Sequence, residues 1–384
     1  MKAVILAAGE GKRLRPFTET KPKVMLPVAN KPIVEHVVDA LAANGIQDII
    51  IVVGYKKESI MQHFKSYQKA NIHFATQEKQ LGTAHALMQA AQFIDDSFIV
   101  LPGDNIISSS SISKLIQHQN EYVIGVKRSN KPSKYGMVSL SNKKLNDIIE
   151  KPAVEQDSLI STGIYTFPTS IFKSIQLLID EGDYTITSLI RNELKKETNI
   201  TAVELHDWID VVYPWDLLSV NDGQLRKTNS SINGIIEKNV TIKGPVFIGK
   251  NTHIHSGTYI VGPVIIGENC EIGPYTCIFP STTIGDNSII RSFSEIRNSV
   301  IMKDVNIGSN TAISHSVIGT GSSVEQGYST LVGAAKKHCN EECISVKDIG
   351  VMIAEDSIIQ PHVITHPGVI ISRYCQISPL KQIQ

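Results

Sequence analysis

The sequence predicts an α/β fold: a Rossmann-like, mainly parallel sheet over residues 1–229, followed by a parallel β-helix over residues 230–384. Two observations predict it. Up to about Asn229, apolar strand-like runs alternate with segments of helical periodicity, which is typical of βαβ units. Beyond Asn229, an aliphatic residue recurs at every sixth position, a period that neither a helix nor an alternating strand produces. The 384 residues are enough for two or three domains with buried cores.

The N-terminal half alternates predicted strands and helices. The runs AVILAA (3–8), DIIIVVG (48–54) and FIVLPGD (98–104) are short and apolar, as buried strands of a parallel sheet are. IVEHVVDALAANG (33–45) has its apolar residues at helical spacing and ends in the natural terminator Gly45. GTAHALMQAAQFI (82–94) also has a helical pattern. We therefore expect a sheet with helices on both faces.

The C-terminal half carries a six-residue repeat with one aliphatic residue in each unit. A small or β-branched residue such as Val240, Thr252 or Cys270 stands two places earlier. This spacing lets each unit form one side of a triangular coil and stacks the aliphatic side chains along the axis, as in a parallel β-helix. The repeat is lost at about 319–350 and returns at Ile353, so we expect a loop excursion or a site there. The repeating positions are Ile236, Ile242, Ile248, Ile254, Ile260, Ile266, Ile272, Ile278, Ile284, Ile290, Ile296 and Met302.

The composition excludes several classes of partner. Lys plus Arg equals Asp plus Glu, with 37 residues on each side, so no overall field draws the chain to nucleic acid or to an anionic membrane. No apolar run reaches the length of a membrane span or of a signal segment. We therefore expect a cytoplasmic protein with no nucleic-acid partner and no membrane partner.

The cysteines and histidines of the C-terminal half do not predict a metal site. The five cysteines are an odd number, which argues against a disulfide framework. Cys270 and Cys375 occupy the small position of the repeat, where we expect packing residues. HCNEEC (338–343) contains ligand residue types but has no second ligand pair nearby. Histidines of the repeats, such as His253 and His255, are expected to be outward-facing polar side chains.

A glycine-rich turn follows the first predicted strand. The stretch LAAGEGKRLRPFTETKPK (6–23) places Gly9 and Gly11 behind that strand, with Arg13 and Lys23 downstream. In open α/β sheets, ligands bind at the carboxyl ends of the strands, and backbone N–H groups of such a turn can cradle phosphate oxygens. The turn lacks the Ser or Thr of a Walker loop and the third glycine of a dinucleotide fingerprint. By itself it predicts only a local anion site.

The whole stretch resembles the signature of the sugar-phosphate nucleotidylyltransferases, a Gly-x-Gly-Thr-Arg core followed by Lys-Pro or Pro-Lys. Chains similar in both halves include archaeal and bacterial bifunctional N-acetylglucosamine-1-phosphate uridylyltransferases/glucosamine-1-phosphate acetyltransferases, whose hexapeptide repeats form a left-handed β-helix. The resemblance continues in order through QEKQLGTAHA (77–86), LPGD (101–104), YGMV (135–138), IIEKP (148–152), STGIY (161–165) and WIDVVYPWDLL (208–218).

The resemblance implies that residues 1–229 are a nucleotidyltransferase domain. It would join an NTP, UTP first and dTTP next, to N-acetylglucosamine 1-phosphate or glucose 1-phosphate and release pyrophosphate. Because the attacking atom is already a phosphate oxygen, the reaction needs positioning, cations and a metal rather than a protein nucleophile. Arg13, Lys23 and Asp104 are the implied catalytic residues. Asp104 and Asp210 are the implied ligands of Mg²⁺, which prefers carboxylate and phosphate oxygens.

The resemblance also implies the residues that bind the two substrates. Gln77 would read the pyrimidine edge through its amide, and Glu150 would accept hydrogen bonds from sugar hydroxyls. Lys12, Val212 and Ser161 depart from the family pattern, which leaves the identity of the hexose open. The implied nucleotide-binding residues are Leu6, Ala8, Gly9, Gly11, Gln77, Gly82 and Thr83, and the implied sugar-binding residues are Gly136, Glu150, Lys151, Ser161 and Thr162.

Three hypotheses cover the role of the β-helix. In the first it assembles the enzyme, and the resemblance implies a homotrimer or a dimer of trimers. In the second it also acetylates glucosamine 1-phosphate with acetyl-CoA, although Ser309 and Ala312 stand where the family has a histidine base and a tyrosine. In the third the chain is a non-catalytic regulatory subunit that senses sugar nucleotides. The retention of the four implied phosphate and metal residues argues against the third.

Overall fold

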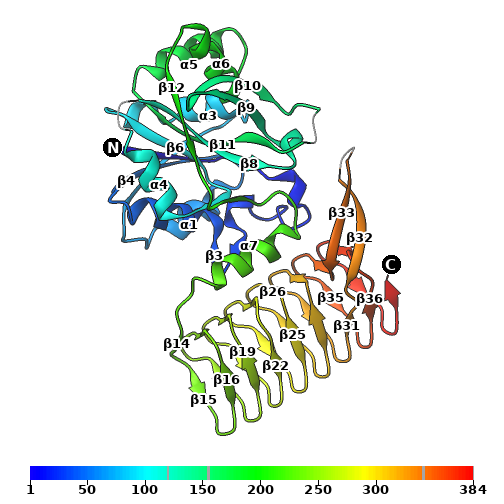
Figure 1. Cartoon of the computed structure of the whole chain (residues 1–384). Coiled ribbons are helices and arrows are strands. Elements are labelled where there is room, and N and C mark those ends of the chain that lie inside the picture. The colour runs from blue at the N-terminus through cyan, green and yellow to red at the C-terminus, as the bar shows by residue number, and fades with distance from the viewer. Residues whose placement is uncertain (119–120, 154–155, 340–341, 384) are drawn as a thin grey trace. The chain divides into compact units, whose positions relative to one another are not determined.

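The structure is a computed structural model that describes residues 1–118, 121–153, 156–339 and 342–383 (Figure 1). The predicted domain boundary after residue 229 stays a prediction. No helix in these ranges is both long and apolar enough to cross a membrane. The chain divides into two compact units, the first made of Met1–Glu10, Thr20–Met25 and Ile33–Asp210 and the second of Gly11–Glu19, Leu26–Pro32 and Val211–Gln384.

The first unit is built on one mixed sheet. Its strands in the described residues are β1 (Lys2–Ala7), β4 (Asp48–Val53), β5 (Asn71–Thr76), β6 (Phe98–Pro102), β8 (Tyr122–Ser129), β9 (Gly136–Ser141), β10 (Lys144–Glu150), β11 (Ser158–Phe167) and β12 (Ile200–Glu204). They lie in the order β5-β4-β1-β6-β11-β8-β12-β10-β9.

Only the first part of this sheet is parallel throughout. The strands β5-β4-β1-β6 are parallel, as the alternation of strands and helices predicts. Beyond β6 the pairings are antiparallel except for β12 with β8. The reason is that β8, β9, β10 and β11 follow one another without an α-helix between them, and a parallel pairing would require a long crossover. The predicted mainly parallel arrangement therefore holds for the N-terminal part of the sheet.

Helices cover both faces of this sheet (Figure 1). One face packs against α1 (Ile33–Ala42), α2 (Lys57–Phe64) and α4 (Ser109–Ile116), and the other against α3 (Thr83–Met88), α5 (Ile171–Asp180) and α6 (Ile186–Lys195). Side chains alternate between the two cores because successive residues of a strand point to opposite faces: Ile49 and Ile51 belong to the first core, and Ile50 and Val52 to the second.

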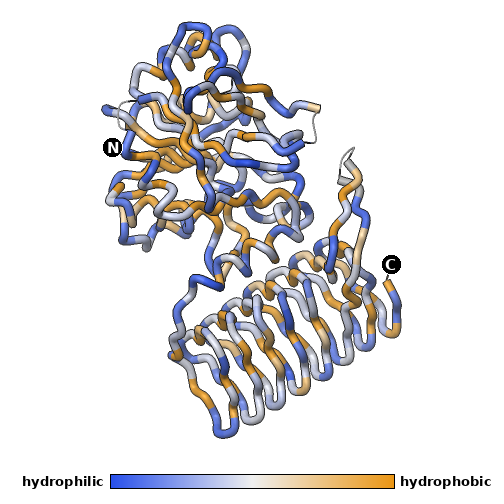
Figure 2. The backbone as a smooth tube through the Cα atoms, in the orientation of Figure 1, coloured by the Kyte–Doolittle hydropathy of each residue, from blue (hydrophilic) through white to orange (hydrophobic). Residues whose placement is uncertain are grey.

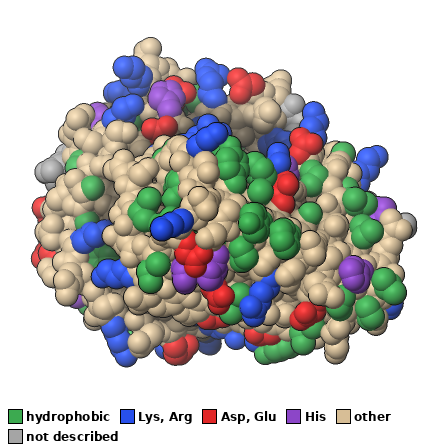
Figure 3. Space-filling model, turned by 90° about the horizontal axis from the view of Figure 1, so that it is seen from below, with side chains coloured by type: hydrophobic (Ala, Val, Ile, Leu, Met, Phe, Trp, Pro, Cys, Tyr) green, Lys and Arg blue, Asp and Glu red, His purple; other side chains and the backbone are tan. Residues whose placement is uncertain are grey.

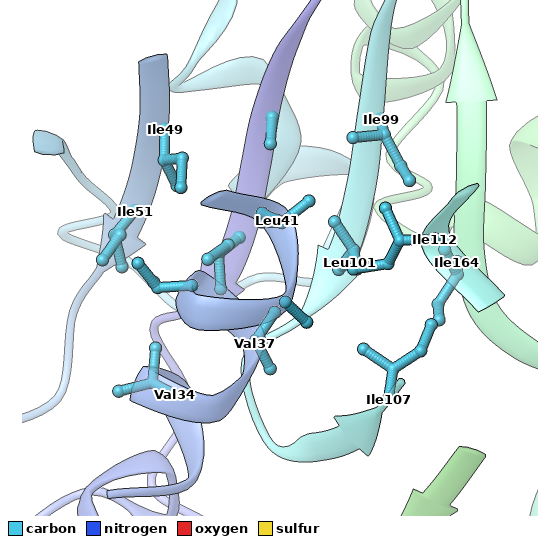
Figure 4. Close-up of a cluster of buried hydrophobic side chains, with 14 of the residues drawn as sticks. Val34, Val37, Leu41, Ile49, Ile51, Ile99, Leu101, Ile107, Ile112 and Ile164 are labelled. Atoms are coloured by element: carbon cyan, nitrogen blue, oxygen red, sulfur yellow. The ribbon is translucent and has the colours of Figure 1, made fainter. Parts of the chain in front are cut away.

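The predicted helix at 33–45 is confirmed as α1, which ends at Ala42. Its apolar face, with Val34, Val37 and Leu41, points toward Ile51 of β4 and Leu101 of β6 (Figure 4). Val34, Val37 and Leu41 are fully buried, which corresponds to about 1.5–3 kcal/mol of favourable transfer free energy for each side chain. This helix is scaffold and carries no predicted site residue.

The second unit contains the parallel β-helix. Among the described residues three eight-stranded parallel sheets stack coil on coil. The first sheet has β14 (Ser231–Ile232), β17 (Val246–Ile248), β20 (Val264–Ile266), β23 (Thr282–Ile284), β26 (Val300–Ile301), β29 (Val317–Ile318), β34 (Met352–Ile353) and β37 (Ile370–Ile371). The second has β15 (Ile235–Ile236), β18 (His253–Ile254), β21 (Glu271–Ile272), β24 (Ile289–Ile290), β27 (Asn306–Ile307), β30 (Ser323–Val324), β35 (Ile358–Ile359) and β38 (Gln376–Ile377). The third has β16 (Thr241–Lys243), β19 (Tyr259–Val261), β22 (Cys277–Ile278), β25 (Glu295–Arg297), β28 (Ala312–Ser314), β31 (Ser329–Thr330), β36 (Ile364–Thr365) and β39 (Gln382–Ile383).

The repeated aliphatic side chains stack inside the coils, as predicted. Figure 2 shows hydrophobic residues recurring along each coil, and Ile254 lies beside Ile272, which lies beside Ile290. All three are fully buried. The fold class predicted for both halves is confirmed, with three parallel sheets as a left-handed β-helix has.

The register of the repeat changes one unit earlier than the six-residue count indicates. Ile284 pairs with Ile301, so Ile301 and not Met302 continues the inner stack. The coil is one residue shorter here, and a second shortening brings Ile318 beside Ile301. Both shortened turns lie at one corner, where Asn298 and His315 have positive φ values of 42° and 51°. A constant period cannot reveal a residue that is missing from a turn.

The interruption of the repeat is shorter than the predicted 319–350 and is a hairpin. The coils continue through β30 and β31, after which β32 (Gly333–Cys339) and β33 (Glu342–Ile349) form an antiparallel pair. The sequence pattern did not show that the coils continue here. Tyr328 stands at the position of the repeat that usually holds a small residue, and Thr330 stands at the position that usually holds an aliphatic one. The buried Tyr328 hydroxyl lies 2.7 Å from Oγ1 of Thr365 in the next coil. Large and small residues have exchanged places, so the aliphatic pattern of the sequence is lost although the coils continue.

Segments from the N-terminal part of the chain belong to the second unit. The hairpin of β2 (Pro27–Val28) and β3 (Lys31–Pro32) is held there by α7 (Asp216–Leu225) and a coil of the β-helix. Asn221 Oδ1 accepts from the Ala29 backbone N–H at 2.8 Å, and its Nδ2 donates to the Ser281 carbonyl at 3.3 Å. Asn30 Nδ2 donates to the Ile284 carbonyl at 2.7 Å. Asn221 is fully buried. Its hydrogen bonds connect α7 with the β2–β3 hairpin and with the coil that contains Ser281.

The surface carries charges of both signs. Figure 3 shows Lys and Arg side chains interspersed with Asp and Glu on the face that it presents. This mixture fits the equal numbers of acidic and basic residues in the chain and leaves any anion site to local geometry.

Candidate active site

The candidate site begins where four parallel strands of the first unit end together. At this edge Tyr55 N–H donates to the Ala8 carbonyl at 3.0 Å, and Gly103 N–H donates to the Leu6 carbonyl at 2.9 Å. The close approach explains Gly54, because a Cβ there would lie 2.8 Å from the Ala8 carbonyl oxygen. The carboxyl edge of a parallel sheet thus brings the ends of β1, β4, β5 and β6 into one place, where open α/β sheets bind ligands.

A two-stranded ribbon brings Asp104 and Asp210 together although they are 106 positions apart in the sequence. β7 (Asn105–Ile107) pairs antiparallel with β13 (Trp208–Asp210), and Asn105 is the partner of Asp210. Asp104 immediately precedes β7. The predicted convergence of the two carboxylates is therefore present in the first unit.

Lys23 lies between these carboxylates. Its Nζ is 2.6 Å from Oδ2 of Asp104 and 3.1 Å from Oδ1 of Asp210. The lysine is 8% exposed. Burial by itself lowers the pKa of Lys23, but the charges and hydrogen bonds of Asp104 and Asp210 outweigh burial and raise the pKa above its ordinary value. The ammonium group is therefore charged throughout the neutral range.

Asn105 holds the two carboxylates in place through hydrogen bonds and is itself held by Trp208. The sequence alone did not identify these roles. In the amide orientation that satisfies its neighbours, Nδ2 of the buried Asn105 lies 3.0 Å from Oδ1 of Asp104 and 3.1 Å from Oδ1 of Asp210, and its oxygen accepts from Nε1 of Trp208 at 2.9 Å. One amide thus fixes both acids and is itself fixed by the indole.

Lys127 of β8 adds a second cation beside the ribbon. Its Nζ donates to the Trp208 carbonyl at 2.5 Å and lies 5.9 Å from the centre of the Trp208 ring. Burial lowers the pKa of Lys127, with a partial offset from Asp207. The clue in the sequence was the position of Trp208 two residues before Asp210, but nothing in the sequence connected Lys127 with that strand.

The residues at this ribbon fit a divalent cation. Two carboxylates already converge on one positive charge, the Lys23 ammonium, and Asn105 constrains their orientation. Hard oxygen donors of this kind suit a small divalent ion that completes its coordination with water and phosphate oxygens.

The predicted residues of the glycine-rich turn lie in both units. Leu6 is the penultimate residue of β1, and Ala8 and Gly9 follow that strand in the first unit. Gly9 is exposed, and a Cβ there would meet nothing within 4 Å, so packing within the protein does not explain the glycine. Gly11 has a φ of 82° in the left-handed region, which explains that glycine. Arg13 is exposed on a short 3₁₀ helix, Lys12–Leu14, in the second unit, and its convergence with Lys23 stays a prediction.

Gln77, Gly82 and Thr83 lie together at the end of β5 and the start of α3. Nε2 of the buried Gln77 is 3.1 Å from the Gly82 carbonyl oxygen and 2.9 Å from Nδ1 of His85. A Cβ on Gly82 would lie 2.4 Å from the Tyr184 carbonyl oxygen, so that approach already requires a glycine. Thr83 Oγ1 accepts from the backbone N–H at the start of α6. Their contact with a nucleotide stays a prediction.

The predicted sugar-binding residues form one cluster across β9, β10 and β11. Glu150 pairs with Gly136 across the β9–β10 hairpin, and Met137 also pairs with Ile160, the residue before Ser161. Glu150 Oε2 accepts from the Thr187 hydroxyl at 2.6 Å. Lys151 directly follows Glu150 and is exposed.

Ser161 and Thr162 are buried in the floor of this cluster. Ser161 Oγ lies 3.1 Å from the Tyr165 hydroxyl, and Thr162 Oγ1 donates to the Gly125 carbonyl at 2.8 Å. Burial raises the pKa of Tyr165 to about 12, and the nearby charge of Glu150 acts in the same direction. Tyr165 thus keeps its proton and can donate a hydrogen bond, a role that the sequence did not indicate.

Two other predictions concern the β-helix. Ser309 and Ala312 do not supply a base, but Nδ1 of His315 is buried without a hydrogen-bond partner in the described structure. Burial lowers the pKa of His315, so its imidazole is neutral at neutral pH. The motif HCNEEC includes residues 340–341, which lie outside the described residues, and its possible metal role stays untested.

The chain matches two families of known proteins. Residues 2–227 match the Nucleotidyl transferase family, and residues 260–335 match the GMPPB C-terminal domain. The first match covers more than half of the chain and includes all the residues predicted to bind substrates or metal.

Similar proteins include enzymes from three archaea. The bifunctional protein GlmU of Methanococcus maripaludis (strain C7) is 42% identical over 325 residues, which are 83% of this chain and 77% of that protein. A bifunctional sugar-1-phosphate nucleotidylyltransferase/acetyltransferase of Sulfurisphaera tokodaii is 34% identical over 394 residues, 99% of this chain and 96% of that protein. A UTP–glucose-1-phosphate uridylyltransferase of Haloferax volcanii is 37% identical over 227 residues, 56% of this chain and 93% of that protein.

A solved structure is also similar to the N-terminal part. It is a crystal structure from Bacillus anthracis, named as a candidate glucose-1-phosphate thymidylyltransferase. The TM-score is 0.55 at 29% identity, and the likeness covers 60% of this chain and 97% of that one.

Proposed function

The chain belongs to the nucleotidyl transferase family of enzymes, and on that premise we propose that it couples an NTP to a hexose 1-phosphate. We expect UTP as the preferred nucleotide, with dTTP next, and N-acetylglucosamine 1-phosphate or glucose 1-phosphate as the sugar. The observation that carries the proposal is the Lys23 ammonium between the carboxylates of Asp104 and Asp210 at the carboxyl edge of the sheet.

The reaction is a displacement at phosphorus. An oxygen of the sugar 1-phosphate forms a bond to the α-phosphorus of the NTP while the bond from that phosphorus to the bridging oxygen breaks. Pyrophosphate leaves with the electron pair, and the product is the nucleoside diphosphate sugar. The charge that builds up around the α-phosphate is the main barrier that the protein must lower.

The residues of the chain divide this task. Lys23 would contact the α-phosphate and the incoming sugar phosphate, and Arg13 would hold the β- and γ-phosphates with paired hydrogen bonds. Leu6, Ala8, Gly9 and Gly11 would line the nucleotide backbone. The open space at Gly9 supports this role because a phosphate can approach the backbone there.

Two separate groups of residues would bind the nucleotide base and the sugar. Gln77 would read the pyrimidine edge, with Gly82 and Thr83 close to the ribose. Glu150 and the Ser161–Tyr165 pair would contact sugar hydroxyls, and Gly136, Lys151 and Thr162 would shape that pocket. The resulting positioning lowers the entropy cost of bringing two polyanions together.

Asp104 and Asp210 would hold the divalent metal, for which we propose Mg²⁺. When bound, the ion neutralises phosphate charge and orients the triphosphate. Asn105 would keep both carboxylates aligned, and Lys23 would limit their mutual repulsion.

A substrate panel tests the proposal. Purified chain with Mg²⁺ would be assayed for pyrophosphate release with each of the four ribonucleotides and dTTP, against N-acetylglucosamine, glucose and glucosamine 1-phosphates. We expect turnover with UTP above the others. The proposal fails if no pair releases pyrophosphate while the protein remains folded by circular dichroism; turnover itself excludes the non-catalytic regulatory subunit.

A second activity is supported by the bifunctional relatives that span most of the chain and by the unpartnered Nδ1 of His315. We propose acetyl transfer from acetyl-CoA to glucosamine 1-phosphate as that activity, with His315 as the base. Release of free thiol with this pair, lost in His315→Gln and not in His118→Gln, would support it. Absence of thiol release would leave the β-helix as an assembly element.

The assembly and location remain proposals as well. We propose a homotrimer or a dimer of trimers through the β-helix, which sedimentation equilibrium of the full chain would test. The nucleoside triphosphate that the reaction consumes supports a cytoplasmic location, which fractionation of cells would test.

A further inference from the structure

A cluster of two histidines and a glutamate lies on the β-helix, outside the residues assigned above. Oε1 of Glu237 is 3.0 Å from Nε2 of His253 and 2.9 Å from Nδ1 of His255. The three ligand atoms all lie within 4.8 Å of one another. Each side chain is partly exposed. His253 and His255 are outward-facing polar residues, as expected, and the structure adds that they share one carboxylate.

The coils create this cluster by stacking. β15 pairs with β18, so that Ile236 lies beside Ile254 and the residues that follow them, Glu237 and His255, are neighbours on adjacent coils. His253 and His255 are two positions apart and project to the same side of the chain. The two histidines of one coil thus meet the carboxylate of Glu237, which lies in the preceding coil. No single segment of the sequence contains the site.

The donor set and its dimensions fit a transition metal. Two imidazole nitrogens and one carboxylate oxygen are the ligands of many Zn²⁺ sites that leave a fourth position open. With bonds of about 2.0–2.1 Å, ligand atoms around a tetrahedral Zn²⁺ lie about 3.3 Å apart. The glutamate oxygen lies 2.9–3.0 Å from each of the two histidine nitrogens, and all three ligand atoms lie within 4.8 Å of one another, so side-chain adjustment would bring them to the tetrahedral spacing.

Neighbouring groups orient two of the three ligands. The second oxygen of Glu237 accepts from the Ser256 backbone N–H at 2.8 Å and from the Ser256 hydroxyl at 2.9 Å. Nε2 of His255, the nitrogen that faces away from Glu237, lies 3.5 Å from Oε1 of Glu271 in the next coil. If this carboxylate moved to hydrogen-bond distance of the imidazole, it would fix the tautomer, as carboxylates do behind metal-binding histidines.

We propose that Glu237, His253 and His255 form a site for a divalent transition metal of the Zn²⁺ class, with Glu271 as a positioning residue. The site joins the first coil of the β-helix to the second, and Glu271 extends it to the third. Because β15 is the first strand of its sheet, no earlier coil of that sheet covers it. The bound metal would stabilise the packing of this terminal coil against the next coil. It is separate from the Mg²⁺ proposed at Asp104 and Asp210.

Zinc binding by the full chain tests the site. Metal-stripped protein in excess Mg²⁺ would be titrated with Zn²⁺ in competition with a chromophoric chelator. We compare wild type, the double variant His253→Gln/His255→Gln, and the matched double variant His118→Gln/His366→Gln. We expect one tight Zn²⁺ per wild-type chain and per matched variant, and its loss in the first double variant. Glu271→Gln should weaken binding by about 10- to 100-fold.

Two further readouts separate this site from others. Zn²⁺ should raise the melting temperature of wild type but not of His253→Gln/His255→Gln, because only a folded state with the site gains binding free energy. The Co²⁺ form should show d–d absorption without a sulfur-to-cobalt charge-transfer band. A sulfur band, equal Zn²⁺ affinity in both double variants, or no tight binding to wild type would each overturn the proposal. Pyrophosphate release by the variants is unchanged in either case.

Discussion

Lys23 combines two roles that are usually assigned to different residues. It is nearly buried and neutralises two carboxylates, and it is also the cation proposed to meet the α-phosphate. Breaking a buried pair by removing one partner leaves an uncompensated charge, so the three side chains behave as a unit. Their substitutions should therefore not be additive.

Asp104→Asn and Asp210→Asn should each lower kcat by about 10²-fold or more. The substitution keeps the shape of the side chain but removes a charged oxygen that the proposed metal needs. Pyrophosphate release at saturating substrates measures the effect. Asp95→Asn, which affects only a surface pair with Lys2, serves as the control and should retain wild-type turnover. Equal activity in all three variants would contradict the assigned metal ligands.

Stability at high pH should report on Lys23. Its folded-state pKa is raised above 10.5, so its stabilising contribution is fully present below that unfolded-state value and is lost as the pH rises through the folded-state pKa. The difference in free energy of unfolding between wild type and Lys23→Met should be constant from pH 7 to about 9.5 and shrink above about 10.5. Urea titrations over this range measure it. A difference that instead grows above pH 10.5 would disprove the direction of the shift.

Gly9→Ala and Gly82→Ala should have different effects: the first should weaken NTP binding, and the second should lower stability. A Cβ at Gly82 would lie 2.4 Å from the Tyr184 carbonyl oxygen, so this variant should lose about 1–3 kcal/mol of stability. A Cβ at Gly9 meets nothing within 4 Å, so that variant should unfold like wild type within about 0.5 kcal/mol while its KM for the NTP rises. Thermal melts and initial rates separate the two. If Gly9→Ala binds the NTP normally, the proposed phosphate contact is wrong.

Long elements were predictable from the sequence, and short ones were not. The helix at 33–45 and the stacked repeats follow from periodicity that extends over many residues. The ribbon β7–β13 has three residues in each strand, too few for a pattern, yet it sets the position of Asp210. Asn105 and Lys127 were missed for a second reason, because they act through partners more than 80 positions away in the sequence.

The exchange of large and small residues around Tyr328 shows how packing can hide a repeat. Tyr328→Phe should lose about 1–3 kcal/mol of stability, because the buried Thr365 hydroxyl loses its partner. Urea unfolding followed by circular dichroism measures it. Tyr275, which is 60% exposed on the same β-helix, gives the control variant Tyr275→Phe, expected to unfold like wild type. If both variants match wild type, the hydroxyl pair carries no net stability.

The glycine-rich turn connects the two units rather than belonging to one of them. The chain passes from the first unit to the second after Glu10 and again after Met25, and it returns before Thr20 and before Ile33. Lys23 therefore lies in a short first-unit segment flanked by two second-unit segments. From this order of segments we expect the proposed phosphate-binding loop to depend on packing within the second unit, a dependence that sequence motifs do not reveal.

Asn221→Leu tests this dependence in the full chain. The substitution leaves the Ala29 N–H and the Ser281 carbonyl without their partner, so we expect a loss of about 1–3 kcal/mol and a lower kcat/KM. Asn71→Leu, which removes one exposed hydrogen bond to Asp48, is the control. Thermal melts and pyrophosphate release on the same samples measure both quantities. If Asn221→Leu is less stable but keeps wild-type activity, the β2–β3 hairpin does not contribute to catalysis.

Stacked coils also limit how the chain length can vary. Asn251 Nδ2 donates to Asn269 Oδ1, and Asn269 Nδ2 donates to Asn287 Oδ1, each acceptor lying 18 residues further along the chain. One full circuit is therefore the unit by which the β-helix can lengthen. Duplication or loss of such a circuit preserves every neighbour, whereas a single inserted residue within a strand would turn its inward side chain outward. The two circuits of 17 residues lost their residue at one shared corner. Length in this half should therefore change by whole circuits or at corners.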